Sequence, residues 1–336
     1  MKRSSLALAG LVAVCTLALT VPSGAAELAP RISDPAHSVV LITTRTSSGE
    51  AAGTGMVLTS SGEVLTNYHV VHGSTEVAVE IPATGQTFTA TVVGHDAGKD
   101  VALLQLEDAS GLATITPDRD ALGVGDTVTA VGNAGGGGEL VAASGIVTAL
   151  EQQVTVGDDS GGSETLVGVI QTTAGAQPGD SGGPMFDAQG EVVGMTTAGS
   201  QTVTRGPRGR GTPSQAVTTT SFAVPIADAL AVVDQIRSGT ESGTVQIGAK
   251  AYLGISVVGS GSLVVGSVVA DGPAAGVGIT PGSVITSLNG TAVTTHAELA
   301  TVLGGLEPGQ QARVAWTDAD GVRHAATLTL GISPVN

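Results

Sequence analysis

Short apolar runs alternate with polar turns along the first two thirds of the chain, which is the pattern of β-strands. The runs are rich in Val, Leu, Ile and Thr and are separated by Gly, Asp or Ser. They cover residues 39–44, 55–58, 62–66, 77–81, 87–94, 101–107, 127–131, 145–150, 166–172 and 191–197. No long helical period appears before residue 227. The pattern predicts a mainly β unit, either a sandwich or a pair of barrels.

A helical pattern closes this unit. Apolar residues recur at helical spacing over residues 225–238, and Asp228 lies near the start, where an acidic side chain suits a helix N-terminus. We therefore predict a C-terminal helix that seals the β unit.

A second unit follows a linker. Residues 239–249 are rich in Gly, Ser and Thr and are expected to connect two domains. Beyond them come strand-length runs and one helical run over residues 296–303. The 336-residue chain is long enough for two domains, which we place at residues 38–238 and 250–334. The second is expected to be the smaller and of α+β class.

Residues 1–26 have the organisation of a secretory signal peptide. Two basic residues precede an apolar run over residues 6–21, and small residues follow it. Cleavage after Ala25 or Ala26 fits the small-x-small rule; a retained anchor is the alternative, although the run is short for a membrane span. We expect an extracytoplasmic protein (secreted, periplasmic or in the cell envelope) that begins with a short lead-in over residues 27–37.

Cys15, the single cysteine, lies inside that apolar run. A lipoprotein cysteine should end the apolar stretch, yet residues 17–21 continue it, so lipidation is not expected. The mature chain would then contain neither a thiol nor a disulfide, which fits an exported protein whose core suffices without cross-links.

Composition limits the classes of partner. Hydrophobic residues make up 41% of the chain and charged residues 12%, so it can bury a core. The formal net charge of −16 argues against nucleic acid or an anionic membrane as the main partner.

The run Gln-Pro-Gly-Asp-Ser-Gly-Gly-Pro at residues 177–184 carries the main chemical signal. A serine hydroxyl attacks a carbonyl only when a base removes its proton, and the resulting oxyanion needs donors already in place. Glycines beside Ser181 allow a tight loop that points the N–H groups of Gly179 and Ser181 into one oxyanion hole. An ordinary Gly/Ser/Pro turn is the alternative, since the chain has 50 glycines.

The other members of a catalytic triad occur upstream. His69 follows a predicted strand in Thr-Asn-Tyr-His-Val, and Asp100 directly precedes the apolar run Val-Ala-Leu-Leu, where its carboxylate can be half buried. The order His, Asp, Ser is that of the chymotrypsin type. Asp96 is the rival carboxylate and is expected to cap the loop instead. Because His69 must be neutral to act as a base, we expect activity to fall as pH drops through its apparent pKa, about 6.5–7 by type.

Three other chemistries fit the sequence less well. The serine motif also matches the nucleophile elbow of α/β-hydrolases, but Pro184 and a strand pattern follow it instead of a helix. His69 and His72 could begin a metal site, but no third ligand has suitable spacing, so neither a metal nor another cofactor is expected. The Gly-rich segments 135–138 and 157–164 could cradle a phosphate, but neither Lys-Ser/Thr nor a helix pattern follows, so we interpret them as mobile loops.

Together these motifs resemble the HtrA/DegP serine proteases over roughly residues 35–335. The matching features are Gly-x-Gly at 53–55, Thr-Asn-x-His, Asp-x-x-x-Asp-Val-Ala-Leu-Leu, Gly132-Asn133 and Pro-Gly-Asp-Ser-Gly-Gly-Pro. The resemblance implies a chymotrypsin-like double β-barrel followed by a PDZ domain.

The PDZ resemblance centres on Tyr252, Leu253, Gly254 and Ile255. Backbone N–H groups of such a loop would bind the C-terminal carboxylate of a peptide, and the adjoining strand edge would pair with that peptide. For these four residues alone, an ordinary hairpin is the alternative.

The resemblance also indicates where substrate binds. In the trypsin-type fold the residue six before the serine lies at the base of the primary pocket, and here it is Gly175. Because the bottom of the pocket has no acidic residue, we expect the pocket to take a small or medium apolar substrate side chain and not Lys or Arg. Residues 221–225 are expected to close the cleft, with their backbone pairing with the bound peptide.

Two departures from the family pattern matter. Most relatives carry Asn where this chain has Asp180; in chymotrypsin-like enzymes an aspartate there pairs with a new N-terminal amine, which cleavage at Arg31-Ile32 could supply. Family trimers have an aromatic-bearing N-terminal segment, whereas Glu27–His37 contains no aromatic residue. Oligomerisation is possible, but the lack of an aromatic residue in this segment counts against a trimer.

The resemblance therefore implies an exported serine endopeptidase that cleaves misfolded or regulatory proteins. Its PDZ domain would bind peptide C-termini or unfolded segments. One alternative is a catalytically minor PDZ-based binding or chaperone protein of the cell envelope. Another is a sensor that cleaves a single regulatory partner.

Overall fold

The computed structural model describes residues 35–46, 49–157, 163–205, 215–241, 243–258 and 263–333. The predicted signal segment, most of the lead-in and the Arg31-Ile32 site lie outside these residues. Within the described ranges, no helix has the length and apolar character that a membrane crossing requires.

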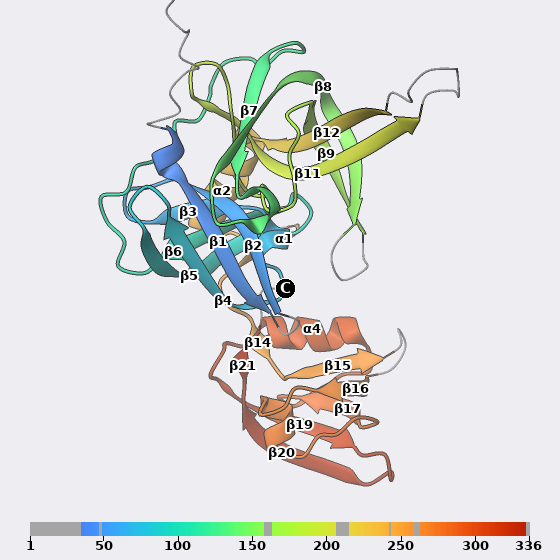
Figure 1. Ribbon diagram of the computed structural model, residues 1–336. Helices are drawn as coiled ribbons and strands as arrows, with labels where there is room; N and C mark the ends of the chain where they lie inside the picture. Colours follow the sequence, from blue (N-terminus) through green and yellow to red (C-terminus); the bar gives the residue numbers. More distant parts are fainter. Residues whose placement is uncertain are drawn as a thin grey trace, which may run out of the picture. The chain divides into compact units, whose positions relative to one another are not determined.

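Six strands of the N-terminal half close into a barrel (Figure 1). They are β1 (Val39–Thr46), β2 (Gly49–Val57), β3 (Glu63–Thr66), β4 (Ser74–Ile81), β5 (Gln86–Asp96) and β6 (Val101–Leu106). Neighbouring strands pair in the order β5-β4-β1-β2-β3-β6, and β5 also pairs with β6, which closes the ring. Strand residues alternate between the two faces, and Val40, Ile42 and Val79 are among those that fill the interior.

A second closed barrel follows. Its strands, in spatial order, are β10 (Pro184–Phe186), β11 (Val192–Arg205), β12 (Gln215–Pro225), β9 (Ser163–Thr172), β8 (Val141–Gly157) and β7 (Thr127–Gly132). Val128, Ile170 and Met185 belong to its own core. The predicted mainly β double barrel is therefore confirmed.

A third apolar cluster joins the two barrels. It combines Met56 and Leu103 of the first barrel with Val131 and Met195 of the second. Helix α2 (Ile226–Arg237) completes this layer, because its buried face contributes Ile226, Ala229, Val232, Val233 and Ile236. The predicted C-terminal helix is thus present, and the packed layer fixes the loops that meet where the barrels adjoin.

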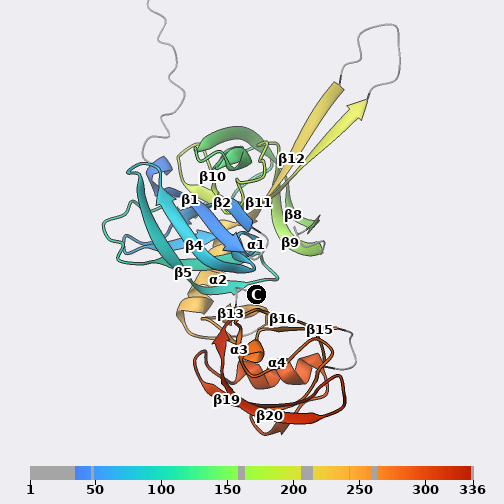
Figure 2. The same ribbon diagram turned by 60° about the horizontal axis from the view of Figure 1, so that its bottom comes forward.

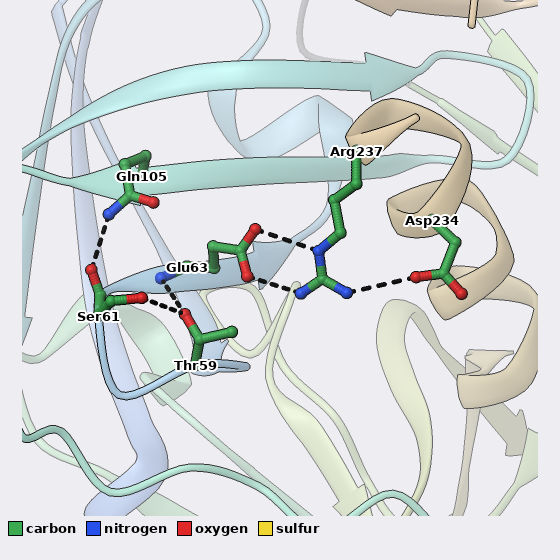
Figure 3. A network of polar contacts seen from close by, with 6 residues as sticks. All are labelled: Thr59, Ser61, Glu63, Gln105, Asp234 and Arg237. Atoms are coloured by element: carbon green, nitrogen blue, oxygen red, sulfur yellow. Dashed lines mark hydrogen bonds and ion pairs between the residues drawn. The ribbon is translucent and has the colours of Figure 1, made fainter. Parts of the chain in front are cut away.

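Arg237, at the end of α2, ties the helix to the first barrel (Figure 3). Its Nε and Nη2 donate to the two carboxylate oxygens of Glu63 at 3.1 and 2.6 Å, and its Nη1 donates to Asp234 at 3.3 Å. Such a bidentate pair is geometrically specific. The Glu63 carboxylate raises the pKa of the Arg237 guanidinium.

Part of the predicted linker is a strand. Residues Val245–Ile247 form β13, which pairs antiparallel with β5 and extends the first sheet. The side chain of Val245 is buried in the cluster between the barrels. The Thr244 hydroxyl donates to Asp96 Oδ1, which also accepts from the N–H groups of Gly98 and Lys99. Asp96 therefore caps this loop, as expected.

The C-terminal unit is a small α+β domain (Figure 2). Its strands are β14 (Ala251–Tyr252), β15 (Ile255–Val258), β16 (Val264–Val268), β17 (Val284–Leu288), β18 (Thr291–Ala292), β19 (Gln311–Thr317), β20 (Arg323–Thr329) and β21 (Gly331–Ile332). Helix α3 (Pro273–Gly276) is one turn, and α4 (His296–Gly304) begins with a capping box made by Thr295 and Glu298. Leu263, Ile285 and Trp316 belong to a separate core.

Candidate active site

His69 and Asp100 are in direct contact. His69 lies in the one-turn helix α1 (Tyr68–Val71) after β3, and Asp100 precedes β6. His69 Nδ1 is 2.8 Å from Asp100 Oδ2, and the His69 backbone N–H donates to Oδ1 at 2.9 Å. The Asp100 side chain is 1% exposed and the His69 side chain 37%. An ionised carboxylate only accepts, so the Nδ1 proton faces Asp100 and Nε2 remains the basic nitrogen.

The Thr-Asn-x-His motif holds this pair in place. Thr66 Oγ1 donates to the Thr54 carbonyl at 2.7 Å, and Asn67 Nδ2 donates to the Asp100 carbonyl at 2.9 Å. Asp100 has a φ of 54°, a conformation that aspartate tolerates better than most side chains. The motif thus anchors the backbone on both sides of the imidazole.

Thr197 links the carboxylate to the serine and was not predicted. Its hydroxyl donates to Asp100 Oδ2, and its carbonyl accepts from Ser181 Oγ at 3.4 Å. The register of β11 against β12 shifts between Thr196 and Ala198, so Thr197 lies at a bulge. Bulges redirect side chains beside active sites. No sequence motif marks this position.

The predicted nucleophile loop, residues 177–184, has the positive-φ glycines that were expected beside Ser181. Gly179 and Gly182 have φ values of 96° and 84°, which glycine adopts without strain. The Gly182 N–H donates to the Thr196 carbonyl at 2.8 Å, which fixes the turn after the serine. Among the described residues, none accepts a backbone hydrogen bond from the N–H groups of Gly179 or Ser181.

Thr54 connects this loop to the first barrel and was also missed. Its N–H donates to the Ser181 carbonyl at 2.9 Å, and its Oγ1 donates to the Gly179 carbonyl at 2.7 Å. The same Oγ1 accepts from the Asn133 N–H at 2.9 Å. The flanking glycines are needed for packing: a Cβ on Gly53 would lie 2.5 Å from Val70 Cγ1. The Gly-x-Gly motif does not specify the residue between the two glycines, so Thr54 could not be predicted from it.

Asp180, the departure from the family pattern, is 4% exposed. Its Oδ2 accepts from the Gln177 N–H at 2.8 Å, whereas Oδ1 has no hydrogen-bond partner among the described residues. Burial raises the pKa of the Asp180 carboxyl, and the Gln177 hydrogen bond partly opposes that rise. Pairing with an Ile32 amine stays a hypothesis, because Ile32 lies outside the described residues.

We expect Asp180→Asn to raise Tm near neutral pH by about 2–4 °C, the effect of roughly 1 kcal/mol in a domain of this size. Because the folded-state pKa lies above the ordinary value of 3.8, the native state holds the proton more tightly than the unfolded state. The stability contribution of Asp180 is therefore lost as pH rises from 3.8 through the raised pKa. The gain in Tm of Asp180→Asn should therefore shrink as the pH falls towards 4, because the native carboxyl is then protonated and neutral like the amide. Thermal melts at several pH values would measure this trend.

The exposed Asp120 is the matched control, since Asp120→Asn removes the same charge from the surface. That variant should show little change in Tm at either pH. A Tm for Asp180→Asn below that of the parent at pH 7.5 would contradict the prediction.

The residue that follows Gly175 contacts uncharged groups. This glycine has a φ of 69°, and a Cβ there would meet no atom within 4 Å. Next to it, the Ala176 N–H donates to the buried Ser221 Oγ at 2.8 Å. A Cβ on Gly199 would lie 2.5 Å from the Ala176 carbonyl oxygen. The segment thus packs against β11 and β12 with no charged group among these contacts.

The expectation that the backbone of residues 221–225 pairs with bound peptide is wrong for its first three residues. Ser221 pairs with Gly199 of β11 and with Thr172 of β9. Phe222 and Ala223 likewise have partners in both strands. Barrel closure uses both edges of β12 here, so no edge is left for a peptide.

The predicted carboxylate-binding loop lies at the start of the C-terminal unit. Leu253 is 2% exposed, and Gly254 has a φ of 78°. The Leu253 and Gly254 carbonyls accept backbone hydrogen bonds, whereas no described residue accepts one from their N–H groups. The loop leads into β15, which is the edge strand of its sheet. An edge strand beside free N–H groups can accept a peptide as an added strand.

Comparison with known families agrees with the division of the chain into a double barrel and a smaller C-terminal unit. The model of the trypsin-like peptidase domain matches residues 53–195, and that of the PDZ domain matches residues 251–326. The first match includes His69, Asp100 and Ser181, and the second includes Tyr252–Ile255.

Individual relatives point the same way. A probable periplasmic serine endoprotease DegP-like of Ectopseudomonas mendocina (strain ymp) is 34% identical over 300 residues, covering 85% of this chain and 57% of the relative. A probable periplasmic serine protease do/HhoA-like of Haemophilus influenzae is 32% identical over 83% of this chain and 58% of its own length. The chain therefore spans less than two thirds of these relatives.

Solved structures extend the comparison to the fold. The HtrA-type protease AlgW with tripeptide superposes with a TM-score of 0.50 at 27% identity, covering 90% of this chain and 96% of that one. AlgW with decapeptide gives a TM-score of 0.50 at 25% identity, with coverage of 90% and 98%. With a trypsin-like peptidase domain followed by a PDZ domain, the chain belongs to the HtrA/DegP-like family.

Proposed function

We propose that this protein is a serine endopeptidase in which Ser181 is the nucleophile, His69 the general base and Asp100 the residue that orients His69. The observation that carries the proposal is the buried Asp100 carboxylate, which accepts from both Nδ1 and the backbone N–H of His69. That arrangement fixes the imidazole tautomer and makes Nε2 the nitrogen that takes a proton. Thr197 acts as a positioning residue through its hydrogen bond to Asp100.

The reaction proceeds through an acyl-enzyme. Ser181 Oγ attacks the peptide carbonyl carbon while His69 Nε2 takes the hydroxyl proton, and the N–H groups of Gly179 and Ser181 stabilise the oxyanion. His69 then gives the proton to the amide nitrogen as the C–N bond breaks, which leaves an ester on Ser181. Water attacks that ester by the same steps and releases the acid.

The contacts near the site support a substrate preference, and the relatives support a location. The neutral contacts around Gly175 support a preference for small or medium apolar side chains on the acyl side of the cleaved bond. The relatives are named periplasmic, which together with the sequence of residues 1–26 supports an extracytoplasmic location. Bulk or regulatory proteins that unfold outside the cytoplasm are the proposed substrates.

Covalent labelling tests the proposal directly. A fluorophosphonate probe should form one adduct, located at Ser181 by peptide mapping, and Ser181→Ala should take no label. Hydrolysis of casein should accompany the labelling, and Ser181→Ala should abolish both. An unlabelled chain, or an adduct on another serine, would overturn the assignment.

Peptide binding by the C-terminal unit is the second candidate function. It is favoured by the edge strand β15 and by the free N–H groups of Leu253 and Gly254. A peptide with a free C-terminal carboxylate should bind the full chain more tightly than the same peptide with a C-terminal amide. Binding without any label on Ser181 would favour a chaperone or tethering protein over a protease.

A further inference from the structure

A cavity of about 150 Å³ lies on the outer face of the first barrel. It is lined by Leu41 and Thr43 of β1, Ala52 of β2, Ala78 and Glu80 of β4, Thr87 of β5, and by Asn133, Gly136 and Gly138 of the loop after β7. The strand residues face away from the barrel interior, because the residues that alternate with them, such as Ile42 and Val79, belong to the core. A cavity of this volume holds a group of about benzene size.

The Gly-rich loop 133–138 forms one wall of this cavity in a defined turn. Asn133 is buried, and its side-chain oxygen accepts from the Gly138 N–H at 2.8 Å. Gly135, Gly136 and Gly138 have φ values of 72°, 68° and 80°, so the turn requires glycine. A Cβ on Gly136 would lie 3.4 Å from the Ala52 Cβ, which places the wall against β2. From the sequence, segment 135–138 is expected only to be a mobile loop.

Hydrogen bonds connect the wall of this cavity to the nucleophile loop. Asn133 donates through its backbone to Thr54, and Thr54 in turn donates to the Gly179 and Ser181 carbonyls. Ala52 precedes Thr54 by two residues on β2, a distance of about 7 Å along a strand. Gly175, at the proposed primary pocket, does not line the cavity. A peptide with its acyl side at Gly175 would therefore cross Ser181 towards Thr54 and Ala52.

The lining suits a cationic side chain with an aliphatic stem. Glu80 is the one charged residue among the lining residues, and it lies across from Leu41 and Thr87 in the strand register. Thr43, Ala52 and Ala78 contribute small side chains to the lining. Lysine and arginine pack their methylene groups on apolar surface while the charged end reaches a carboxylate.

We propose that this cavity is a specificity site for the leaving side of the substrate, which takes a Lys or Arg side chain from the second residue after the cleaved bond. Glu80 is the specificity-determining residue. The inference rests on the proposed protease function, and it adds a charge preference on the leaving side to the neutral preference on the acyl side.

Paired quenched-fluorescence peptides test this site. They share one sequence and differ only in Lys, Ala or Glu at the second residue after the bond, whose cleavage is verified by mass spectrometry. For the full-length protein at low salt we expect kcat/KM to be about fivefold higher with Lys than with Glu, the effect of an exposed charge pair. The ratio should approach one in Glu80→Gln and invert in Glu80→Lys. For the parent protein it should shrink at 0.5 M NaCl, because the Debye length falls to about 4–5 Å and the charge interaction is screened.

Glu76 provides the matched control. It lies on the same strand and face as Glu80, but it is paired with Arg45 at 2.8 Å and does not line the cavity. Glu76→Gln should therefore keep the parent ratio. Cleavage with equal ratios in the parent and in Glu80→Gln would overturn this inference while leaving the protease assignment intact. Cleavage of none of the three peptides, together with no label on Ser181, would instead overturn the protease assignment and this inference with it.

Discussion

Asp100→Asn should lower kcat by a factor of about 10³–10⁴ while changing KM little. The Asp100 carboxylate accepts from His69 Nδ1, from the His69 backbone N–H and from Thr197 Oγ1. An asparagine at this position has one acceptor oxygen, so its amide N–H groups would face His69 or Thr197. If they face Nδ1, the imidazole proton moves to Nε2, and the base that Ser181 needs is lost. Steady-state kinetics on a quenched peptide would measure the change.

Asp96→Asn is the matched control for this loss. Asp96 lies four residues upstream, and its Oδ1 accepts from the N–H groups of Gly98 and Lys99. Asparagine keeps that oxygen, so the loop should stay capped and kcat should stay within about threefold of the parent. Equal losses in the two variants would mean that Asp100 supports the loop and does not orient His69.

The candidate triad was accessible from the sequence because each member lies inside a short motif with local spacing. His69, Asp100 and Ser181 could be chosen over their rivals by the strand, turn or apolar run beside them. Thr54 and Thr197 could not, because each acts across a long separation: Thr54 on Gly179 and Thr197 on Asp100. Their roles depend on how the barrels pack and on a bulge in β11, which no local pattern encodes.

Contacts between residues far apart in the sequence also explain the two segments that differ from expectation. The backbone of Ser221–Ala223 is paired on both edges because β9 closes the second barrel, a contact between distant strands. Residues Val245–Ile247 lie in a stretch with linker composition, yet they pair with β5. Strand pairing of this kind is decided by the edge that is available, and composition says little about it.

Gly179→Ala should lower kcat by at least about 10²–10³, the effect of removing one oxyanion donor. Gly179 has a φ of 96°, and a Cβ there would lie 2.2 Å from the Asn133 carbonyl oxygen and 2.9 Å from the Gly136 N. Because both neighbours are backbone atoms, the nucleophile loop must move and the Gly179 N–H must turn away from the substrate carbonyl. The hydrogen bond from Thr54 Oγ1 to the Gly179 carbonyl should be lost with it.

Gly125→Ala separates backbone strain from this steric clash. Gly125 has a φ of 100°, close to that of Gly179, but a Cβ there would meet no atom within 4 Å. Both variants should lose about 1 kcal/mol of stability from the unfavourable φ, whereas only Gly179→Ala should also lose most of its turnover. Labelling of Ser181 by a fluorophosphonate should slow in the same proportion, because the phosphoryl oxygen occupies the same hole. Parent-like turnover in Gly179→Ala would show that the N–H of residue 179 does not face the reacting carbonyl, and the oxyanion hole would have to be sought elsewhere.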